Sequence, residues 1–191
     1  MVNRVIKCGD FSLEFGKRTL VMGILNVTPD SFSDGGNFFD CEKAVAHAES
    51  LASQGADIID VGGESTRPGS EAISLEEELG RVIPVIEGIV KKVKVPISID
   101  TCKSEVAKAA LDSGASMIND ISALRFDTKV GDVAVKYDAP LVLIHMKGTP
   151  RDMQKNPTYT SVIGEIKEFL KKRVEFAIPM SHCLFRFPTS R

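Results

Sequence analysis

The residues whose types could do chemistry are polar side chains that stand directly after short apolar runs. Asn26, Asp100 and Asn119 each follow such a run, and the segment 62–64 (Gly-Gly-Glu) and His145 follow two others. Acid and amide groups can hydrogen-bond a polar ligand, and a carboxylate also attracts a positive charge. If the runs are strands, these side chains gather where the strands end, as in a site that is built from several strands.

Two polar loops accompany these positions. In the loop 62–69 (GGESTRPG), the Arg67 guanidinium could pair with a phosphate, assisted by the hydroxyls of Ser65 and Thr66 and by backbone N–H groups. The alternative for Arg67 is a solvated surface charge. The loop 26–36 is polar, ends in two glycines and is long for a connection from strand to helix, so it could act as a mobile lid.

The elements that must position these residues are strands and helices in alternation. Short continuous apolar runs are typical of strands that are buried on both faces of a parallel sheet. Among the helix signals, Asp40 is interpreted as an N-cap, Ser74 with Glu77 as a capping box, and Pro84 as an internal kink. We expect strands over 20–25, 58–61, 95–99, 116–118 and 141–144, and helices over 41–54, 75–90, 103–112, 128–137 and 162–178.

This alternation predicts an α/β fold with a parallel sheet. An open, doubly wound sheet that binds a nucleotide should carry a glycine-rich fingerprint after its first strand, whereas the turn at 26–30 reads NVTPD. Polar residues after nearly every strand favour a (β/α)8 TIM-barrel type instead. A complete barrel takes about 250 residues, so these 191 residues are expected to form an incomplete barrel of about five units. A hairpin over 5–15 is expected to cover its bottom.

The pattern changes after residue 178, where PMSHCLFRFPTSR has neither a helical nor a strand period. One interpretation is a frayed terminus. The other, which we favour, is a truncated or frame-shifted end in place of the last third of a barrel, because five barrel strands expose two sheet edges and an unfilled interior. We therefore predict a partial barrel over 1–178 and an irregular tail over 179–191.

The composition indicates a soluble globular protein, with 43% hydrophobic and 26% charged residues. A net charge of −2 gives no basic footprint, so no nucleic-acid partner is expected. No apolar run approaches the roughly 20 residues that span a bilayer, so no membrane partner is expected either. The four cysteines are scattered without a C-x-x-C pair, which argues against a disulfide scaffold or a cysteine zinc site and favours the cytoplasm.

Five motifs in this order resemble the dihydropteroate synthase family, over about residues 4–178. They are NVTPDSF at 26–32, GGESTRPG at 62–69, IDT-x-K at 99–103, IND at 118–120 and HMKGTPRDMQ at 145–154. The resemblance implies a (β/α)8 barrel and an enzyme of folate biosynthesis that sulfonamides target. It implies that para-aminobenzoate is joined to 7,8-dihydropterin-6-ylmethyl diphosphate, with release of pyrophosphate and with Mg²⁺ on the diphosphate as the cofactor.

The resemblance also implies roles for single residues. Asn26 would meet the metal and the diphosphate, and Thr66 and Arg67 would contact the anion. Asp100 and Asn119 would hydrogen-bond the pterin ring. By its charge, Asp100 is also placed to stabilise a cationic pterin.

The remaining assignments that the resemblance implies concern the pocket walls and the loops. Ile121 and Met146 match apolar walls of the pterin pocket. Phe32 and Pro68 would line the aminobenzoate side when the two loops close, and Asp34 would hold the closed form. The catalytic set is therefore Asp100, Arg67 and Asp34.

Three parts of the family pattern do not follow residue 178: an aspartate in a D-P-G motif, a lysine, and an Arg-x-His pair. The usual contacts of the family's homodimer also lie on helices of that last third. Two alternatives to an active synthase therefore stay open. One is a fragment that binds a pterin without turnover, and the other is a pterin-dependent methyltransferase that hands a methyl group to a corrinoid, although NVTPDSF and STRPG argue against the latter.

Overall fold

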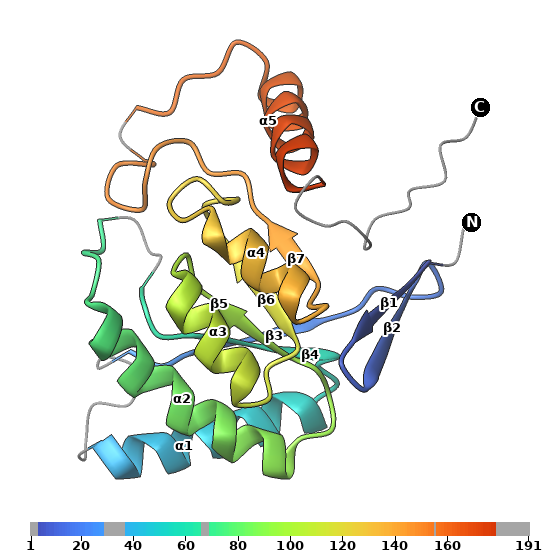
Figure 1. Cartoon of the computed structure of the whole chain (residues 1–191), viewed down its shortest axis with the longest axis vertical. Helices are drawn as coiled ribbons and strands as arrows, with labels where there is room; N and C mark the ends of the chain where they lie inside the picture. Colours follow the sequence, from blue (N-terminus) through green and yellow to red (C-terminus); the bar gives the residue numbers. More distant parts are fainter. Residues whose placement is uncertain (1–3, 29–36, 66–68, 155, 179–191) are drawn as a thin grey trace.

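The structure is a computed structural model that describes residues 4–28, 37–65, 69–154 and 156–178. Five parallel strands form one sheet in the order β3-β4-β5-β6-β7, and β1 pairs with β2 in an antiparallel hairpin (Figure 1). The strands are β1 (Arg4–Cys8), β2 (Phe11–Phe15), β3 (Met22–Asn26), β4 (Ile58–Gly62), β5 (Ile97–Asp100), β6 (Met117–Asp120) and β7 (Leu141–Leu143). The helices are α1 (Asn37–Ser53), α2 (Leu75–Lys92), α3 (Ser104–Asp112), α4 (Lys129–Lys136) and α5 (Val162–Ala177).

All five predicted strands are present, and a helix joins each strand to the next. Sequential parallel strands with helices between them form the wall of a (β/α) barrel, so the predicted fold class is confirmed. The predicted N-cap at Asp40 is wrong, because α1 begins at Asn37 and Asp40 lies within it. An aspartate costs only a fraction of a kcal/mol inside a helix, so the capping signal at this position does not fix the helix start.

The start of α2 follows the predicted cap only in part. The Ser74 hydroxyl accepts a hydrogen bond from the Glu77 backbone N–H at 3.1 Å, as expected. The Glu77 carboxylate instead forms an ion pair with Arg81 one turn later, at 2.5 Å. Pro84 lies inside α2, which runs on to Lys92. The kink expected there stays a prediction.

The sheet presents two unlike faces, because alternate residues of a strand point to opposite sides. On one face Leu25, Ile59, Val61, Ile99 and Ile118 are buried in the main hydrophobic core. Residues of α1, α2, α3 and α4 complete that core and cover this face (Figure 1). The opposite face therefore corresponds to the interior of a barrel, and its side chains are the ones that can reach a ligand.

The hairpin closes the end of the sheet at which the strands begin. Cys8 and Leu13 form a second apolar cluster with Ile58 and Met117, the first residues of β4 and β6. The turn passes through Gly9 with a φ of 57°, a left-handed conformation that glycine adopts without strain. The predicted hairpin and its place at the bottom of the barrel wall are confirmed.

The helix α5 is attached differently from the other four. None of its residues is buried. The Arg173 guanidinium connects it to the β6–α4 loop by donating to the carbonyls of Ala123 at 2.6 Å and Leu124 at 3.0 Å. The predicted tail 179–191 lies outside the described residues.

Candidate active site

Three of the polar residues chosen from the sequence lie in one row at the ends of the strands. The sheet register pairs Asn26 with Gly62, Gly62 with Asp100, and Asp100 with Asn119. Residues paired across neighbouring strands point to the same face, so the three side chains project into the barrel interior at the same height. The sheet thus brings together an acid and two amides from β3, β5 and β6.

Two glycines at the end of β4 leave room in this row. A Cβ atom on Gly62 would lie 3.5 Å from the Oδ2 atom of Asp100 and 3.8 Å from the Oδ1 atom of Asn26, so both oxygens border the same small space. A Cβ atom on Gly63 would lie 2.7 Å from a methyl carbon of Val82, so here the chain passes close to α2. A larger residue at position 62 would therefore narrow the space between the side chains of Asn26 and Asp100.

Asp60 is a member of the site that the sequence analysis missed. It lies two residues before Gly62 on β4, points to the same face and is 2% exposed. Its Oδ2 atom accepts a hydrogen bond from the Nδ2 atom of Asn119 at 3.0 Å. The signal was an acid inside the apolar run 58–61, which is out of place in a strand buried on both faces unless one face lines a site.

Asp60, Asp100 and Asn119 form the floor of the site. The electrostatics of this floor favour ligands that are cationic or rich in N–H donors. Burial, and then the nearby carboxylates with Asp60 first among them, raises the pKa of Asp100 from 3.8 to about 7. Burial also raises the pKa of Asp60. The Oδ1 atoms of Asp60, Asp100 and Asn119 are buried and have no hydrogen-bond partner among the described residues. These three oxygen atoms can act as acceptors, and the buried Ser98 hydroxyl on the same face is also without a partner in the described part of the chain.

A second set of charges lies beside the row and holds the loops in place. The Lys103 ammonium pairs with the carboxylates of Glu64 and Glu78, each at 2.5 Å. The Thr101 hydroxyl donates to the other oxygen of Glu78 at 2.6 Å. Glu78 is only 1% exposed, so Lys103 supplies its compensating charge. The network joins the start of the β4–α2 loop to the start of α3.

The predicted apolar walls, Ile121 and Met146, come together after β6 and β7. Both line a cavity of about 280 Å³, and Met146 is 6% exposed. The β6–α4 loop that carries Ile121 is fixed by Asp120, which points to the helix-covered face. The Asp120 carboxylate accepts hydrogen bonds from the backbone N–H groups of Ser122 at 2.8 Å and Leu124 at 2.6 Å. Asn119 and Asp120, adjacent in the IND motif, therefore point to opposite faces of the sheet: Asn119 towards the barrel interior and Asp120 towards the helices.

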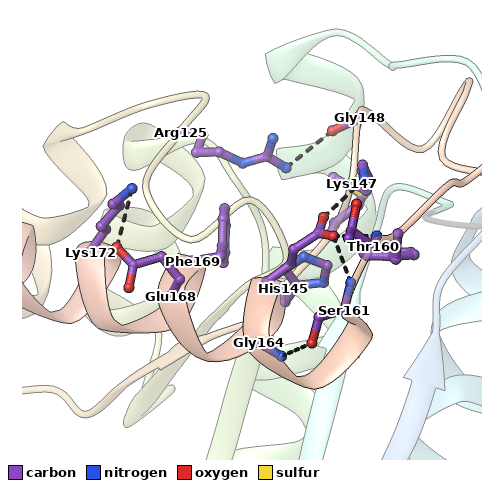
Figure 2. A pocket seen from close by; sticks show the side chains of 13 residues that line it. Arg125, His145, Lys147, Gly148, Thr160, Ser161, Gly164, Glu168, Phe169 and Lys172 are labelled. Carbon is purple, nitrogen blue, oxygen red and sulfur yellow. Dashed lines mark hydrogen bonds and ion pairs between the residues drawn. The ribbon is translucent and has the colours of Figure 1, made fainter.

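A larger cavity of about 560 Å³ opens between the segment after β7 and α5 (Figure 2). His145 lines it and packs edge-on against the ring of Phe169, with 4.9 Å between the ring centroids. Arg125 lies over the same ring at 5.5 Å. His145 is therefore a packed aromatic residue of this cavity.

The residues predicted in the two long loops, Phe32, Asp34, Thr66, Arg67 and Pro68, lie outside the described residues. Within the described ranges, no three His, Cys, Asp or Glu side chains are grouped as ligands of a metal ion. In the same ranges, no helix combines the length and the apolar content that crossing a bilayer requires.

Comparison with known proteins places this geometry in a family. A model of the family described as pterin binding enzyme matches residues 22–179. The chain belongs to the pterin-binding enzyme family. Among curated relatives of this chain, the dihydropteroate synthase of Synechocystis sp. is 48% identical over 169 residues, and that of Bacillus subtilis is 46% identical over 175 residues. The matches cover 88% and 92% of this chain but 58% and 60% of the relatives.

Solved structures agree with the family and with the fold. Dihydropteroate synthase of Xanthomonas albilineans with 4-aminobenzoic acid matches with a TM-score of 0.86 at 47% identity, over 94% of this chain and 63% of that one. The Yersinia pestis enzyme in a sulfonamide drug complex matches with a TM-score of 0.85 at 39% identity, over 94% and 65% of the two chains. The chain thus carries part of the barrel fold of these proteins and spans about 60% of the length of the two curated relatives described above.

Proposed function

We propose that this chain binds 7,8-dihydropterin-6-ylmethyl diphosphate at the row of Asn26, Asp100 and Asn119 and condenses it with para-aminobenzoate, as a dihydropteroate synthase does. The observation that carries the proposal is the convergence of these three side chains at the strand ends. The curated relatives named dihydropteroate synthase support it. So does the Xanthomonas albilineans enzyme, whose solved structures contain 4-aminobenzoic acid or 7,8-dihydropteroate.

The reaction breaks the bond between the pterin methylene carbon and the diphosphate oxygen, and the electron pair leaves with the diphosphate. The amine of para-aminobenzoate then forms a bond to the methylene carbon and loses a proton. Asp100 and Asn119 hold the pterin ring through its N–H groups, since their unused oxygens are acceptors. The Asp100 carboxylate also stabilises the positive charge that develops on the pterin as the diphosphate departs.

The diphosphate lies next to Asn26 in this proposal. The amide oxygen of Asn26 borders the space beside Gly62 together with Asp100. Mg²⁺ prefers oxygen ligands and is usually held by one or two carboxylates together with waters and substrate phosphates; here the Asn26 amide oxygen would be the protein ligand, and the diphosphate would supply the negative charge. Mg²⁺ would neutralise the charge of the leaving diphosphate, while the chain supplies one oxygen ligand and the position of the pterin.

The residues of the two long loops complete the proposed site. Thr66 and Arg67 contact the diphosphate, since a guanidinium pairs with phosphate oxygens through two parallel N–H groups. Phe32 and Pro68 line the side at which para-aminobenzoate enters, and Asp34 holds the loops closed. Ile121 and Met146 form apolar walls of the pterin pocket, in line with the cavity that both of them border.

A second candidate function is pterin binding without turnover. The observation that favours it is that the described residues bring together the row of Asn26, Asp100 and Asn119, which is all that this candidate needs. The two candidates share the pterin site and differ in the chemical step. Pterin-dependent methyl transfer is not favoured, because the relatives are named dihydropteroate synthase.

Two measurements on the same preparation separate these candidates. Calorimetric titration with 7,8-dihydropterin-6-ylmethyl diphosphate and Mg²⁺ reports binding, and a coupled pyrophosphate-release assay with para-aminobenzoate reports turnover. The Asp100→Asn variant should lose at least tenfold in pterin affinity, whereas Asp132→Asn, the same substitution at an exposed position of α4, should bind as the wild type does. Binding without pyrophosphate release supports the second candidate. Absence of binding by the wild type rejects both.

A further inference from the structure

Asp60 is buried below the row of site residues and reaches only one of them. It is 2% exposed, and the strand register places it opposite Ser98, one level below the pair formed by Gly62 and Asp100. Gly62, the next residue of β4 on this face, has no side chain, and Ser98 on the intervening strand β5 has a small one. The space between β4 and β6 therefore stays open at the level of Asp60. Across that space the Asp60 carboxylate accepts from the Asn119 amide at 3.0 Å.

This hydrogen bond fixes which end of the Asn119 amide is left over. An amide group offers a carbonyl oxygen at one end and an NH₂ group at the other, and an asparagine without a strong partner can turn either end towards a ligand. A charged carboxylate only accepts hydrogen bonds, so opposite Asp60 the NH₂ group is held and the Oδ1 atom is left unused. The Oδ1 atom of Asn119 is indeed buried and has no partner among the described residues.

The neighbouring acid leaves an acceptor of the same kind. The Oδ1 atom of Asp100 is also buried and unpartnered in the described part of the chain, and the register pairs Asp100 directly with Asn119. Two adjacent acceptors match a ligand edge with two adjacent N–H donors. A carbonyl at either position would leave two oxygen atoms facing each other without a hydrogen, which costs about the desolvation of both groups.

We propose that Asp60 is a positioning residue that holds the Asn119 amide with its oxygen towards the ligand, and that it thereby selects a 2-amino-4-oxo pyrimidine edge over a 2,4-dioxo edge. This inference rests on the proposed function, because it concerns the pterin site. It assigns to Asp60 no contact with the ligand. Its effect passes through Asn119 alone, so it should change selectivity between ligands rather than abolish binding.

The test compares 6-hydroxymethylpterin with 6-hydroxymethyllumazine, which differ in the amino or oxo group at C2. Both are titrated by calorimetry at a series of pH values, because burial raises the pKa of Asp60 and the argument concerns its charged form. The wild type should bind the pterin at least tenfold more tightly than the lumazine. In Asp60→Asn the preference should fall about tenfold, because either end of each amide can then face the other. Asp132→Asn, which removes an exposed carboxylate on α4, should keep the wild-type preference.

A double substitution separates positioning from a merely structural role and also covers a poorly folded single variant. In Asp60→Asn together with Asn119→Asp, the buried amide donates to the carboxylate at position 119, whose other oxygen again faces the ligand as an acceptor. The preference for the pterin should then return to within about threefold of the wild type. A preference that is unchanged in Asp60→Asn, or that is not restored in the double variant, overturns the inference while the proposed function stands. A wild type that binds neither compound overturns both.

Discussion

Replacing Asp100 by asparagine tests the electrostatics of the site with little change of shape. Burial and the nearby carboxylates raise the pKa of Asp100 from 3.8 to about 7 in the folded chain. In the unfolded chain the pKa returns to about 3.9. The folded state thus binds the proton more tightly, so the contribution of this group to stability is full below about pH 4 and is lost as the pH rises through about 7.

The expected size of this loss follows from the shift. One pKa unit corresponds to about 1.4 kcal/mol, so between about pH 4.5 and 7.5 the wild type should lose about 3 kcal/mol relative to Asp100→Asn, which cannot titrate. The assay is urea unfolding of both chains at a series of pH values, with the difference in unfolding free energy plotted against pH. The difference cancels the titration of all other groups that the substitution leaves unchanged.

A matched control is Asp112→Asn on α3. Asp112 is exposed, and its hydrogen bonds with Lys108 and Tyr137 lower its pKa. The contribution of Asp112 to stability is therefore present at pH values above the ordinary pKa of an aspartate and is lost only as the pH falls. The difference in unfolding free energy between the wild type and Asp112→Asn should thus be flat from about pH 5 upwards. An equally flat curve for Asp100→Asn would refute the view that the floor of the site lacks a compensating charge.

Three further predictions concern the loops and the ligand. In urea unfolding, Lys103→Met should cost about 3–5 kcal/mol because it leaves a buried carboxylate unpaired, whereas loss of the exposed pair in Lys108→Met should leave the midpoint nearly unchanged. Gly63→Ala should destabilise the chain by about 1–3 kcal/mol, because its Cβ atom would clash with Val82. Gly80→Ala in α2, where the space is open, should stabilise the chain by up to about 1 kcal/mol. The reverse order of the two variants in urea unfolding would contradict the close packing of Gly63 against α2. Pterin affinity should rise with pH through about 7, because N–H donors favour the charged form of Asp100, and calorimetry in buffers of different ionisation enthalpy should detect proton release.

The sheet and the row of polar residues could be predicted from the sequence because both depend on local patterns. A strand buried on both faces appears as a continuous apolar run, and the run ends where the strand ends. The polar residue that follows is therefore placed at the carboxyl edge of the sheet, where parallel strands bring such residues together. This is why Asn26, Asp100 and Asn119 could be selected without knowledge of the packing.

The features that the sequence analysis missed depend on contacts between distant segments. Asp60 stands inside an apolar run, and its pairing with Asn119 follows from the register of three strands. The cavity beside His145 depends on where α5 lies, and Arg173 fixes that position through carbonyls about 50 residues earlier in the chain. The acid inside the run 58–61 is visible locally, but its pairing with Asn119 and the position of α5 cannot be read from a window of neighbouring residues.

The two acidic clusters at this edge of the sheet differ in how their charge is balanced, and that difference separates support from binding. Glu78 is nearly inaccessible to solvent, yet it is matched by Lys103 and Thr101, so this cluster is complete and holds the loop in place. Asp60 and Asp100 have no cation hydrogen-bonded to them among the described residues, and burial raises the pKa of both carboxyl groups. Folding alone does not compensate this charge. A ligand with N–H donors or a developing positive charge supplies what the floor lacks, so the same imbalance that lowers stability above about pH 7 favours binding.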